Sequence, residues 1–137
     1  PILRPGQRII YKHKGQTNVY LDLSLLRNVI INLVSNAIKF STENSRIDVS
    51  GEVNEKNILI SVCDYGLGIP DDDKKHLFER FFRAKNVTNI QGTGLGLHIV
   101  SKYVELMNGK IEVNSELEKG TEFNIQFPYE QNTADRR

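Results

Sequence analysis

The sequence is poor in several residue types, and each shortage excludes a class of protein. Its 137 residues include one cysteine, one methionine and no tryptophan. The single cysteine, Cys63, cannot form a disulfide within the chain, and its place in an apolar run predicts a buried small side chain. No apolar stretch approaches the roughly 18 residues of a membrane-spanning helix, and no signal-peptide pattern opens the chain. We therefore exclude a disulfide-stapled scaffold and expect no direct membrane contact.

An excess of charge of either sign is also lacking. The 18 basic and 17 acidic residues leave a formal net charge of +1. A chain with so little net charge has no overall field to attract nucleic acid or an anionic membrane, so we expect no nucleic-acid partner. Any site for an anionic ligand must be local, and a cytoplasmic location is expected, with membrane anchoring of a parent protein left open.

Length and composition predict one folded domain. Hydrophobic residues make up 39% of the chain and charged residues 26%, which is ordinary for a globular protein. We expect a linker over residues 1–6, the domain over residues 7–128 and a tail over residues 129–137. The chain begins with proline and its only methionine, Met107, is internal, which predicts a segment of a longer polypeptide.

Hydrophobic periodicity predicts the order of strands and helices. Strands are expected at residues 8–13, 18–21, 46–53, 57–64, 110–114 and 121–128, and helices at residues 22–39, 76–82 and 95–107. Asp22 or Ser24 is the expected N-cap of the first helix. The strand at residues 57–64 is nearly continuous in apolar residues, so we expect it at the centre of the sheet.

The short helix expected at residues 76–82 has an acidic run before it and apolar residues within it. We interpret Asp71 to Asp73 as a charged helix start rather than a metal site. The apolar residues should pack in the core; they are Leu77, Phe78, Phe81 and Phe82. Residues 83–91 are polar without periodicity and predict a loop, placed where a lid over a ligand would be needed.

The first helix carries a narrow polar stripe on an otherwise apolar surface. At 100° per residue the stripe contains Asn28, Asn32, Ser35, Asn36 and Lys39. Asparagine lowers helix stability by roughly half a kcal/mol relative to alanine, and a merely solvated face would more often hold Glu, Lys or Gln. We therefore favour a functional role over a solvated face for Asn32, Asn36 and Lys39, while Asn28 is balanced between the two.

Two glycine clusters predict a nucleotide site. Asp64 is followed by Gly66 and Gly68, which places a carboxylate acceptor beside a backbone that a ligand can approach closely. The second cluster, Gly92-Thr93-Gly94-Leu95-Gly96-Leu97, opens a helix, where free N–H groups and the helix dipole favour phosphate. Each motif alone is a weak signal, and the polar stripe is the third element.

Taken in order, four segments resemble the boxes of one known domain family. Residues 32–40 resemble its N box, residues 64–69 its G1 box, residues 77–83 its F box and residues 92–97 its G2 box. The chain is therefore similar, over nearly its whole length, to the catalytic and ATP-binding domain of bacterial sensor histidine kinases. This domain belongs to the GHKL superfamily, which also includes gyrase-type, chaperone and mismatch-repair ATPases.

The resemblance implies an α+β fold and an adenine-binding end of the site. The expected fold is a two-layer α/β sandwich, with a mixed sheet of about five strands and three helices on one face. Asp64 would accept the adenine amino group, with close approach at Gly66, Gly68 and Ile69. Thr121 would hold a bridging water, and Phe40 would lie against the adenine or the ribose.

The resemblance also implies a phosphate-binding end that takes the cofactors ATP and Mg²⁺. Asn36 would ligate Mg²⁺, Asn32 would support the metal or the phosphates, and Lys39 would pair with a phosphate. Backbone N–H groups of the second cluster would contact the phosphates; its members are Gly92, Thr93, Gly94, Leu95, Gly96 and Leu97. Arg83 would reach the γ-phosphate from the loop side.

Some positions depart from the family's commonest pattern. Asn28 stands where an acid or histidine often opens the N box, which puts activation of a nucleophile there in doubt. Tyr65 replaces a residue that is often smaller or an amide, and His98 replaces one that is often small. We interpret His98 as a packed or surface helix residue rather than a catalytic group, and His13 and His76 likewise.

The resemblance implies transfer of the ATP γ-phosphate to a histidine on a separate domain of the same parent protein, its dimerisation and histidine-phosphotransfer domain. A response regulator would be an indirect partner. No histidine here sits in a His-Glu-x-x-x-Pro setting, so the chain should bind Mg-ATP and ADP without phosphorylating itself. One alternative is an ATPase that hydrolyses ATP to drive a conformational change, which the short segment at residues 84–91 disfavours. Another is a nucleotide-binding regulatory module without kinase activity, which the retained Asp64, Asn36 and Lys39 disfavour.

Overall fold

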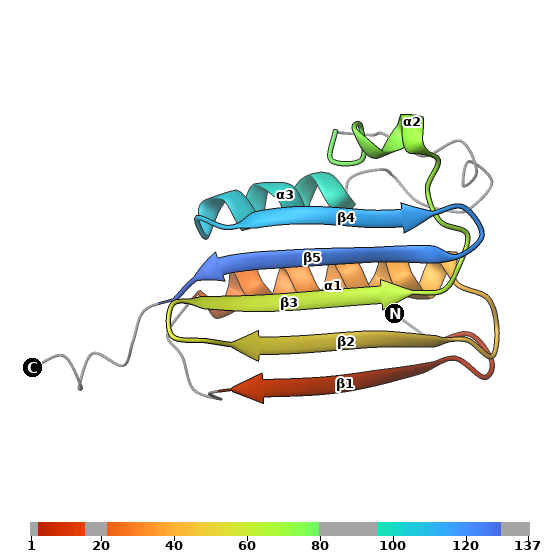
Figure 1. Ribbon diagram of the computed structural model, residues 1–137, viewed down its shortest axis with the longest axis horizontal. Helices are drawn as coiled ribbons and strands as arrows, with labels where there is room; N and C mark the ends of the chain where they lie inside the picture. The colour runs from red at the N-terminus through yellow and green to blue at the C-terminus, as the bar shows by residue number, and fades with distance from the viewer. Residues whose placement is uncertain (1–2, 16–21, 80–95, 130–137) are drawn as a thin grey trace, which may run out of the picture.

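The computed structural model describes residues 3–15, 22–79 and 96–129 (Figure 1). The elements are β1 (Arg8–Gly15), α1 (Leu23–Phe40), β2 (Arg46–Val53), β3 (Asn57–Asp64), α2 (Asp71–Lys74), α3 (Gly96–Leu106), β4 (Lys110–Glu116) and β5 (Gly120–Pro128). The five strands form one sheet in the order β1-β2-β3-β5-β4, with β3 at its centre as expected. The expected strand at residues 18–21 lies outside the described residues.

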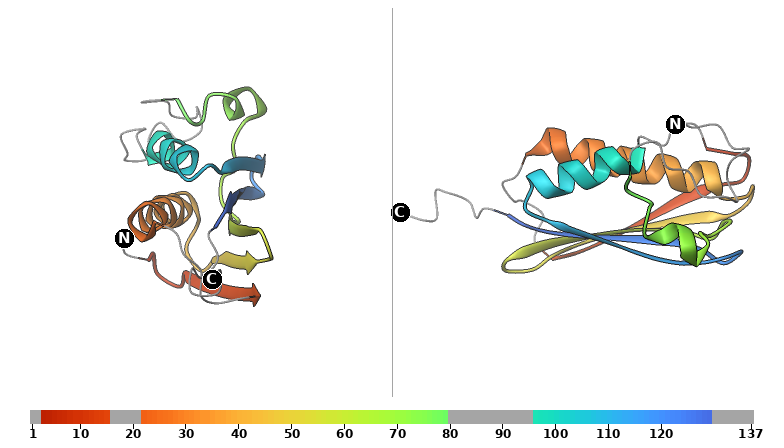
Figure 2. Two further views of the ribbon diagram at one scale, coloured as in Figure 1. Left: turned by 90° about the vertical axis from the view of Figure 1, so that its left-hand side faces the viewer. Right: turned by 90° about the horizontal axis from the view of Figure 1, so that it is seen from above.

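The sheet is mixed, and its two long helices lie together on one face. β1 and β2 run parallel because α1 crosses over between them, and the remaining neighbours are antiparallel. α1 and α3 cover the same face of the sheet (Figure 2). The expected two-layer α+β fold is therefore confirmed. No described helix is long and apolar enough to cross a membrane.

The third helix differs from the one expected at residues 76–82. It is the single turn α2 at the acidic run itself, and it lies beside β4 near the end of the sheet where β3 finishes (Figure 1). Pro70 fixes the chain direction and three aspartates favour the positive end of a helix, so the turn begins there. The bonds that follow join residues three apart, such as His76 N–H to Asp73 O at 3.0 Å, so the α-helix does not continue through residues 76–79. Residues 80–82 lie outside the described residues.

α1 begins and packs as its sequence predicts. The Asp22 carboxylate accepts the Leu25 N–H at 3.1 Å, which identifies Asp22 as the N-cap. The buried residues lie on the predicted apolar arc; they are Val29, Leu33, Ala37 and Ile38. They meet the inward face of α3, on which Val100 and Val104 are buried.

The residues of β3 alternate in burial although the strand is nearly continuous in apolar residues. Ile58, Ile60 and Val62 are buried under the helices, whereas the alternate residues are only half-buried on the other face. An antiparallel sheet with one uncovered face produces this alternation even in a central strand. Cys63 is accordingly half-buried rather than buried, and its partial burial raises the pKa of the thiol.

The expected core of the segment after α2 is confirmed where it is described. Leu77 is buried, and the Phe78 ring packs edge-on against Phe123 with ring centroids 6.3 Å apart. Phe81 and Phe82 lie outside the described residues. The described part of the segment after α2 therefore packs onto β5.

Candidate functional site

Asp64 ends β3 at the edge of the core and is only 7% exposed. Burial, the largest influence, raises the pKa of its carboxyl to about 6, while hydrogen bonds from the backbone of Gly66 and Thr121 oppose this rise. The Gly66 N–H donates to Oδ1 at 2.9 Å. A carboxylate has more lone pairs than these donors use, so Asp64 can still accept a hydrogen bond from a ligand.

The glycines after Asp64 are required by neighbouring backbone. A Cβ on Gly66 would lie 2.0 Å from the Phe40 carbonyl oxygen, at the last residue of α1. Gly68 has a φ of 72°, and a Cβ there would lie 2.1 Å from the Glu116 carbonyl oxygen. The loop at residues 64–69 therefore fits closely between α1 and the β4–β5 hairpin, and close approach of a ligand to it stays a prediction.

The β4–β5 hairpin fixes this loop from its other side. The Glu118 N–H donates to the Leu67 carbonyl at 2.7 Å, and the Ile69 N–H donates to the Ser115 hydroxyl at 2.8 Å. Ser115 Oγ also lies 2.8 Å from Oγ1 of the buried Thr121. Sequence reasoning missed Ser115; the signal that could have found it is a polar residue at an inward position of an alternating strand.

A cavity opens beside this group of residues. It has a volume of about 470 Å³, and Asp64, Ser115 and Thr121 form part of its lining. Lys74 of α2 and Lys119 of the hairpin line it as well. Cys63 and Tyr65 line it too, so this open hollow reaches the uncovered face of the sheet. We call residues 64–69 together with Thr121 the carboxylate wall.

The polar stripe of α1 faces the beginning of α3. Asn32 donates its amide N–H to the Asn28 carbonyl at 2.8 Å, which leaves its amide oxygen as an acceptor. A Cβ on Gly96 would lie 3.3 Å from Asn32 Oδ1 and 4.0 Å from Asn36 Oδ1. Both amide oxygens therefore lie close to the first residue of α3, and we call Asn32, Asn36 and Gly96 the amide wall.

The amide wall fits a metal-bound polyphosphate in its chemistry. Amide oxygens are ligands of the kind that Mg²⁺ accepts, and the N-terminus of a helix favours phosphate. Asn28 likewise donates its amide N–H to the carbonyl four residues earlier, that of Ser24, at 2.9 Å, but Asn28 is exposed. Lys39 is exposed and Phe40 half-buried on the last turn of α1.

Of the remaining predicted site residues, Leu97 is the one that the structure describes. It lies on the first turn of α3 and is half-buried. The others lie outside the described residues; they are Arg83, Gly92, Thr93, Gly94 and Leu95. The roles expected of them, and the loop expected at residues 83–91, stay predictions.

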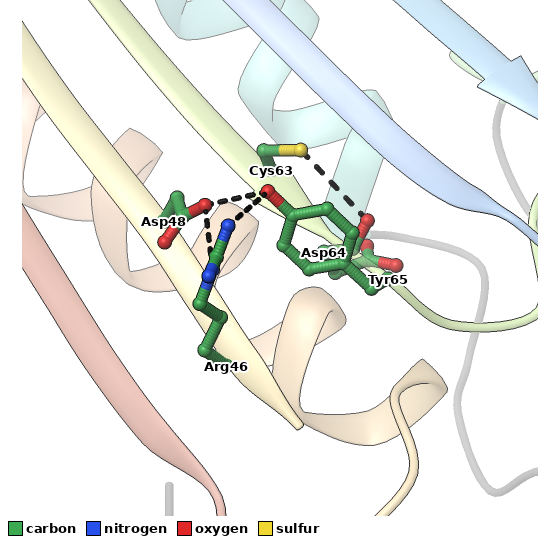
Figure 3. Close-up of polar contacts among 5 residues, drawn as sticks. All are labelled: Arg46, Asp48, Cys63, Asp64 and Tyr65. Carbon is green, nitrogen blue, oxygen red and sulfur yellow. Dashed lines mark hydrogen bonds and ion pairs between the residues drawn. The ribbon is translucent and has the colours of Figure 1, made fainter.

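Tyr65, which departs from the family pattern, belongs to a polar cluster on the uncovered face of the sheet (Figure 3). Its hydroxyl donates to Asp48 Oδ2 at 2.6 Å, and Arg46 Nε donates to the same oxygen at 3.1 Å. The Arg46 guanidinium lies 5.1 Å from the centre of the Tyr65 ring. The Tyr65 hydrogen bond is the main cause that lowers the pKa of Asp48. These contacts hold Tyr65, the residue after Asp64, against β2. Arg46 and Asp48 were not predicted from the sequence.

His98 has a packing role. Its Nδ1 lies 3.1 Å from the Phe78 carbonyl oxygen, and because a carbonyl only accepts, Nδ1 is the donor. The contact joins the first turn of α3 to the segment after α2. This agrees with the interpretation of His98 as a packed residue.

Comparison with known proteins places this geometry in a family. Residues 21–131 match the family described as "Histidine kinase-, DNA gyrase B-, and HSP90-like ATPase". The signal transduction histidine-protein kinase ArlS of Staphylococcus epidermidis is 41% identical over 102 residues, which are 73% of this chain and 22% of that protein. ArlS of Staphylococcus aureus strain USA300 is 41% identical over 96 residues, or 69% of this chain and 21% of that protein. The chain thus spans about a fifth of the length of these relatives.

Solved structures agree with the sequence matches. The mycobacterial sensor histidine kinase MprB superposes with a TM-score of 0.78 at 28% identity, covering 90% of this chain and 86% of that one. Full-length ShkA in complex with AMPPNP gives a TM-score of 0.80 at 29% identity, covering 93% of this chain and 26% of that one. The resemblance to the catalytic domains of sensor histidine kinases is therefore confirmed. The chain belongs to the family of histidine kinase-, DNA gyrase B- and HSP90-like ATPases.

Proposed function

We propose that this chain is the Mg-ATP-binding catalytic domain of a two-component sensor histidine kinase, and that it donates the ATP γ-phosphate to a histidine on a separate dimerisation domain. The observation that supports the proposal is that the described structure contains two walls of different chemistry, one of amide oxygens and one around a buried carboxylate. The amide wall lies where α3 begins, and the carboxylate wall lies where β3 ends (Figure 1). A nucleotide has a base and a polyphosphate, and each wall suits one of them.

The carboxylate wall would recognise the base. Asp64 accepts a hydrogen bond from the adenine amino group, Thr121 holds a bridging water, and Phe40 lies against the adenine or the ribose. Leaving the buried Asp64 carboxylate without a hydrogen-bond donor from the base costs free energy. A base without an amino group at that position therefore binds more weakly. Nucleotide selectivity is thus assigned to Asp64.

The amide wall would align the phosphates. Asn36 holds Mg²⁺ through its amide oxygen with support from Asn32, and Lys39 pairs with a phosphate oxygen as a point charge. When bound, Mg²⁺ supplies neutralisation of phosphate charge. Phosphoryl transfer asks a protein mainly for alignment and charge neutralisation, so these side chains, with the backbone of residues 92–97 and with Arg83, meet that requirement.

The phosphate acceptor would lie outside this chain. The relatives named above are signal transduction histidine kinases, and this chain spans about a fifth of their length. No histidine of the sequence has the setting expected of a phosphorylated one. The proposed partners are therefore the dimerisation and histidine-phosphotransfer domain of the parent protein and, through it, a response regulator.

A paired binding and transfer experiment tests the proposal. The chain is titrated with Mg-ADP by calorimetry, and then incubated with radiolabelled ATP and a separately expressed dimerisation domain of the parent. We expect Mg-dependent binding, acid-labile label on the dimerisation domain and none on this chain. Asp64→Asn should abolish measurable binding, whereas the control Asp72→Asn, at an exposed aspartate of α2, should leave it unchanged.

The outcomes separate the alternatives. Release of inorganic phosphate without labelling of the dimerisation domain would replace the proposal with an ATPase. Binding with neither labelling nor release would replace it with a nucleotide-binding regulatory module. Equal affinity of Asp64→Asn and the unchanged chain would contradict the assignment of the base to Asp64.

A further inference from the structure

The C-terminus of α1 is capped by distant segments rather than by its own sequence. α1 ends at Phe40, and its C-cap Ser41 is extended, with a φ of −97° and a ψ of 158°. Gln7 Nε2 donates to the carbonyls of Ile38, Ser41 and Thr42, at 3.2, 3.4 and 3.2 Å. The carbonyls at the end of a helix lack partners within it, so this one side chain supplies donors to carbonyls at and just beyond the end of α1. The Thr42 carbonyl also accepts the Ser45 hydroxyl, at 2.6 Å.

The Gln7 side chain is buried, and both ends of its amide group are hydrogen-bonded. Its side chain is nearly enclosed, with 7% of the residue exposed, and its Oε1 accepts the Arg4 N–H at 2.8 Å. The Arg4 guanidinium donates to the Lys39 carbonyl at 2.8 Å. The Asn44 N–H donates to the Pro5 carbonyl at 3.1 Å. Residues 4–7 therefore form a folded turn against the end of α1, and cationic and amide donors there also suit the negative end of the helix dipole.

The capped turn of α1 is also part of the candidate site. It carries Lys39 and Phe40, which are proposed to contact the nucleotide. The Phe40 carbonyl accepts the Leu67 N–H at 3.2 Å and fills the space beside Gly66. The end of α1 is thus held on one side by residues 4–7 and on the other by the loop that orients Asp64.

We propose that Gln7 is a positioning residue for the nucleotide: by capping α1 it fixes Phe40 and, through the Phe40 carbonyl, the loop at residues 64–69. This inference rests on the proposed nucleotide binding. Because coupling between two sites is reciprocal, a bound nucleotide should in turn stabilise the turn at residues 4–7. A movement that pulls this turn away from α1 would weaken nucleotide binding.

The test replaces the amide by a side chain of similar length that cannot donate. Gln7→Met should weaken Mg-ADP binding about tenfold, within the range typical of coupling between sites. Amide hydrogen exchange at Leu67 without nucleotide should speed up by about fivefold, because the acceptor Phe40 carbonyl is held less firmly. Both measurements are made at a temperature at which circular dichroism shows each variant to be fully folded.

A control variant separates positioning from a general loss of stability. Ile58→Val truncates a buried residue at the beginning of β3, at the other end of the strand from Asp64. It should lower the melting temperature while leaving both the Mg-ADP affinity and the Leu67 exchange unchanged. Arg4→Met removes an exposed donor to the same helix end and should weaken binding by about twofold to threefold.

The two proposals can fail separately. If the unchanged chain does not bind Mg-ADP, the proposed function is overturned, and the inference with it. If the unchanged chain binds and Gln7→Met keeps its affinity and its Leu67 exchange rate, only the positioning role is overturned. If Gln7→Met does not fold, Arg4→Met decides, and unchanged affinity together with unchanged Leu67 exchange contradicts the inference.

Discussion

The two walls of the candidate site are held in different ways. In the carboxylate wall, backbone contacts backbone: Gly66 and Gly68 fit against carbonyl oxygens of α1 and the β4–β5 hairpin, and Glu118 bonds to Leu67. In the amide wall, the atoms of the described residues that a Cβ on Gly96 would meet are the side-chain oxygens of Asn32 and Asn36. Backbone positions in a packed fold cannot shift independently, whereas side chains can change rotamer. The first wall is suited to a rigid base and the second to flexible phosphates.

The largest effect should follow from disturbing the carboxylate wall through Gly120, which precedes Thr121 and lies against the Asp64 backbone. Gly120 has a φ of 126°, and a Cβ there would lie 2.0 Å from the Asp64 carbonyl oxygen. We expect Gly120→Ala to destabilise the fold by about 3 kcal/mol or more, because both the backbone conformation and the contact are unfavourable. Urea unfolding measures this change.

Gly51→Ala provides the matched control for that substitution. A Cβ on Gly51 would meet the Tyr11 hydroxyl oxygen at 3.1 Å, which is the far end of a flexible side chain. The stability of this variant should stay within about 0.5 kcal/mol of the unchanged protein. Similar losses for the two variants would show that the carboxylate wall is no stiffer than the rest of the sheet.

The next effect concerns the charge inside the carboxylate wall. The pKa of Asp64 rises from 3.8 to about 6 on folding, so the folded chain holds this proton more firmly than the unfolded chain. Asp64 therefore contributes stability that is fully present below pH 3.8 and is lost as the pH rises through about 6. A rise of this size corresponds to about 3 kcal/mol.

Asp64→Asn removes that dependence. Relative to the unchanged protein, this variant should gain stability steadily between about pH 4 and pH 7, by up to about 3 kcal/mol, while losing nucleotide binding. Urea unfolding across this pH range gives the comparison. Parallel stability profiles for the two proteins would show that Asp64 ionises as an ordinary carboxyl.

A smaller effect is expected in the amide wall. Gly96→Ala places a methyl group 3.3 Å from Asn32 Oδ1, a side-chain atom that can move. Stability should change by less than about 0.5 kcal/mol, since alanine also favours the helix. Mg-ADP affinity should fall by about fivefold, because the methyl group separates the two amide oxygens from the phosphates. A loss of stability as large as that of Gly120→Ala would remove the distinction between the walls.

The smallest effect belongs to the support of the carboxylate wall on the uncovered face. Tyr65→Phe removes the hydroxyl that donates to Asp48 but keeps the ring beneath Arg46. Tyr65 is 43% exposed, so we expect a loss of less than about 1 kcal/mol in thermal or urea unfolding. A larger loss, accompanied by weaker nucleotide binding, would make this cluster an essential part of the wall.

The sequence alone predicts those features that depend on local periodicity. The ends of β3, the apolar arc of α1 and its N-cap follow from the spacing and types of neighbouring residues. The convergence of Asn32 and Asn36 with Gly96 was expected from the family resemblance and is observed. The ends of β3 and the apolar arc and N-cap of α1 need no knowledge of which distant segments meet, whereas the place of Gly96 beside α1 follows only from the family resemblance.

Features made by distant contacts could not be predicted in this way. The hydroxyl of Ser115 and the amide of Gln7 gain their roles from acceptors and donors many residues away. Arg46 and Asp48 are ordinary charges on a strand until the register brings them beside Tyr65. The misplaced short helix has a local cause, because Leu77 and Phe78 are apolar enough to suggest a helix, whereas hydrogen bonding after Lys74 takes the tighter form.

The pairing of β3 with β5 decides when the site can form during folding. The β2–β3 and β4–β5 hairpins are local in the chain, whereas the pairing of β3 with β5 joins strands that α2, α3 and β4 separate in the sequence. Loop closure over such a distance is slow compared with hairpin formation. Asp64 and Thr121 face each other across this pair, so we expect the carboxylate to stay hydrated until the last long-range step. Pulsed hydrogen exchange at Gly66 should show its amide protected later than those of either hairpin.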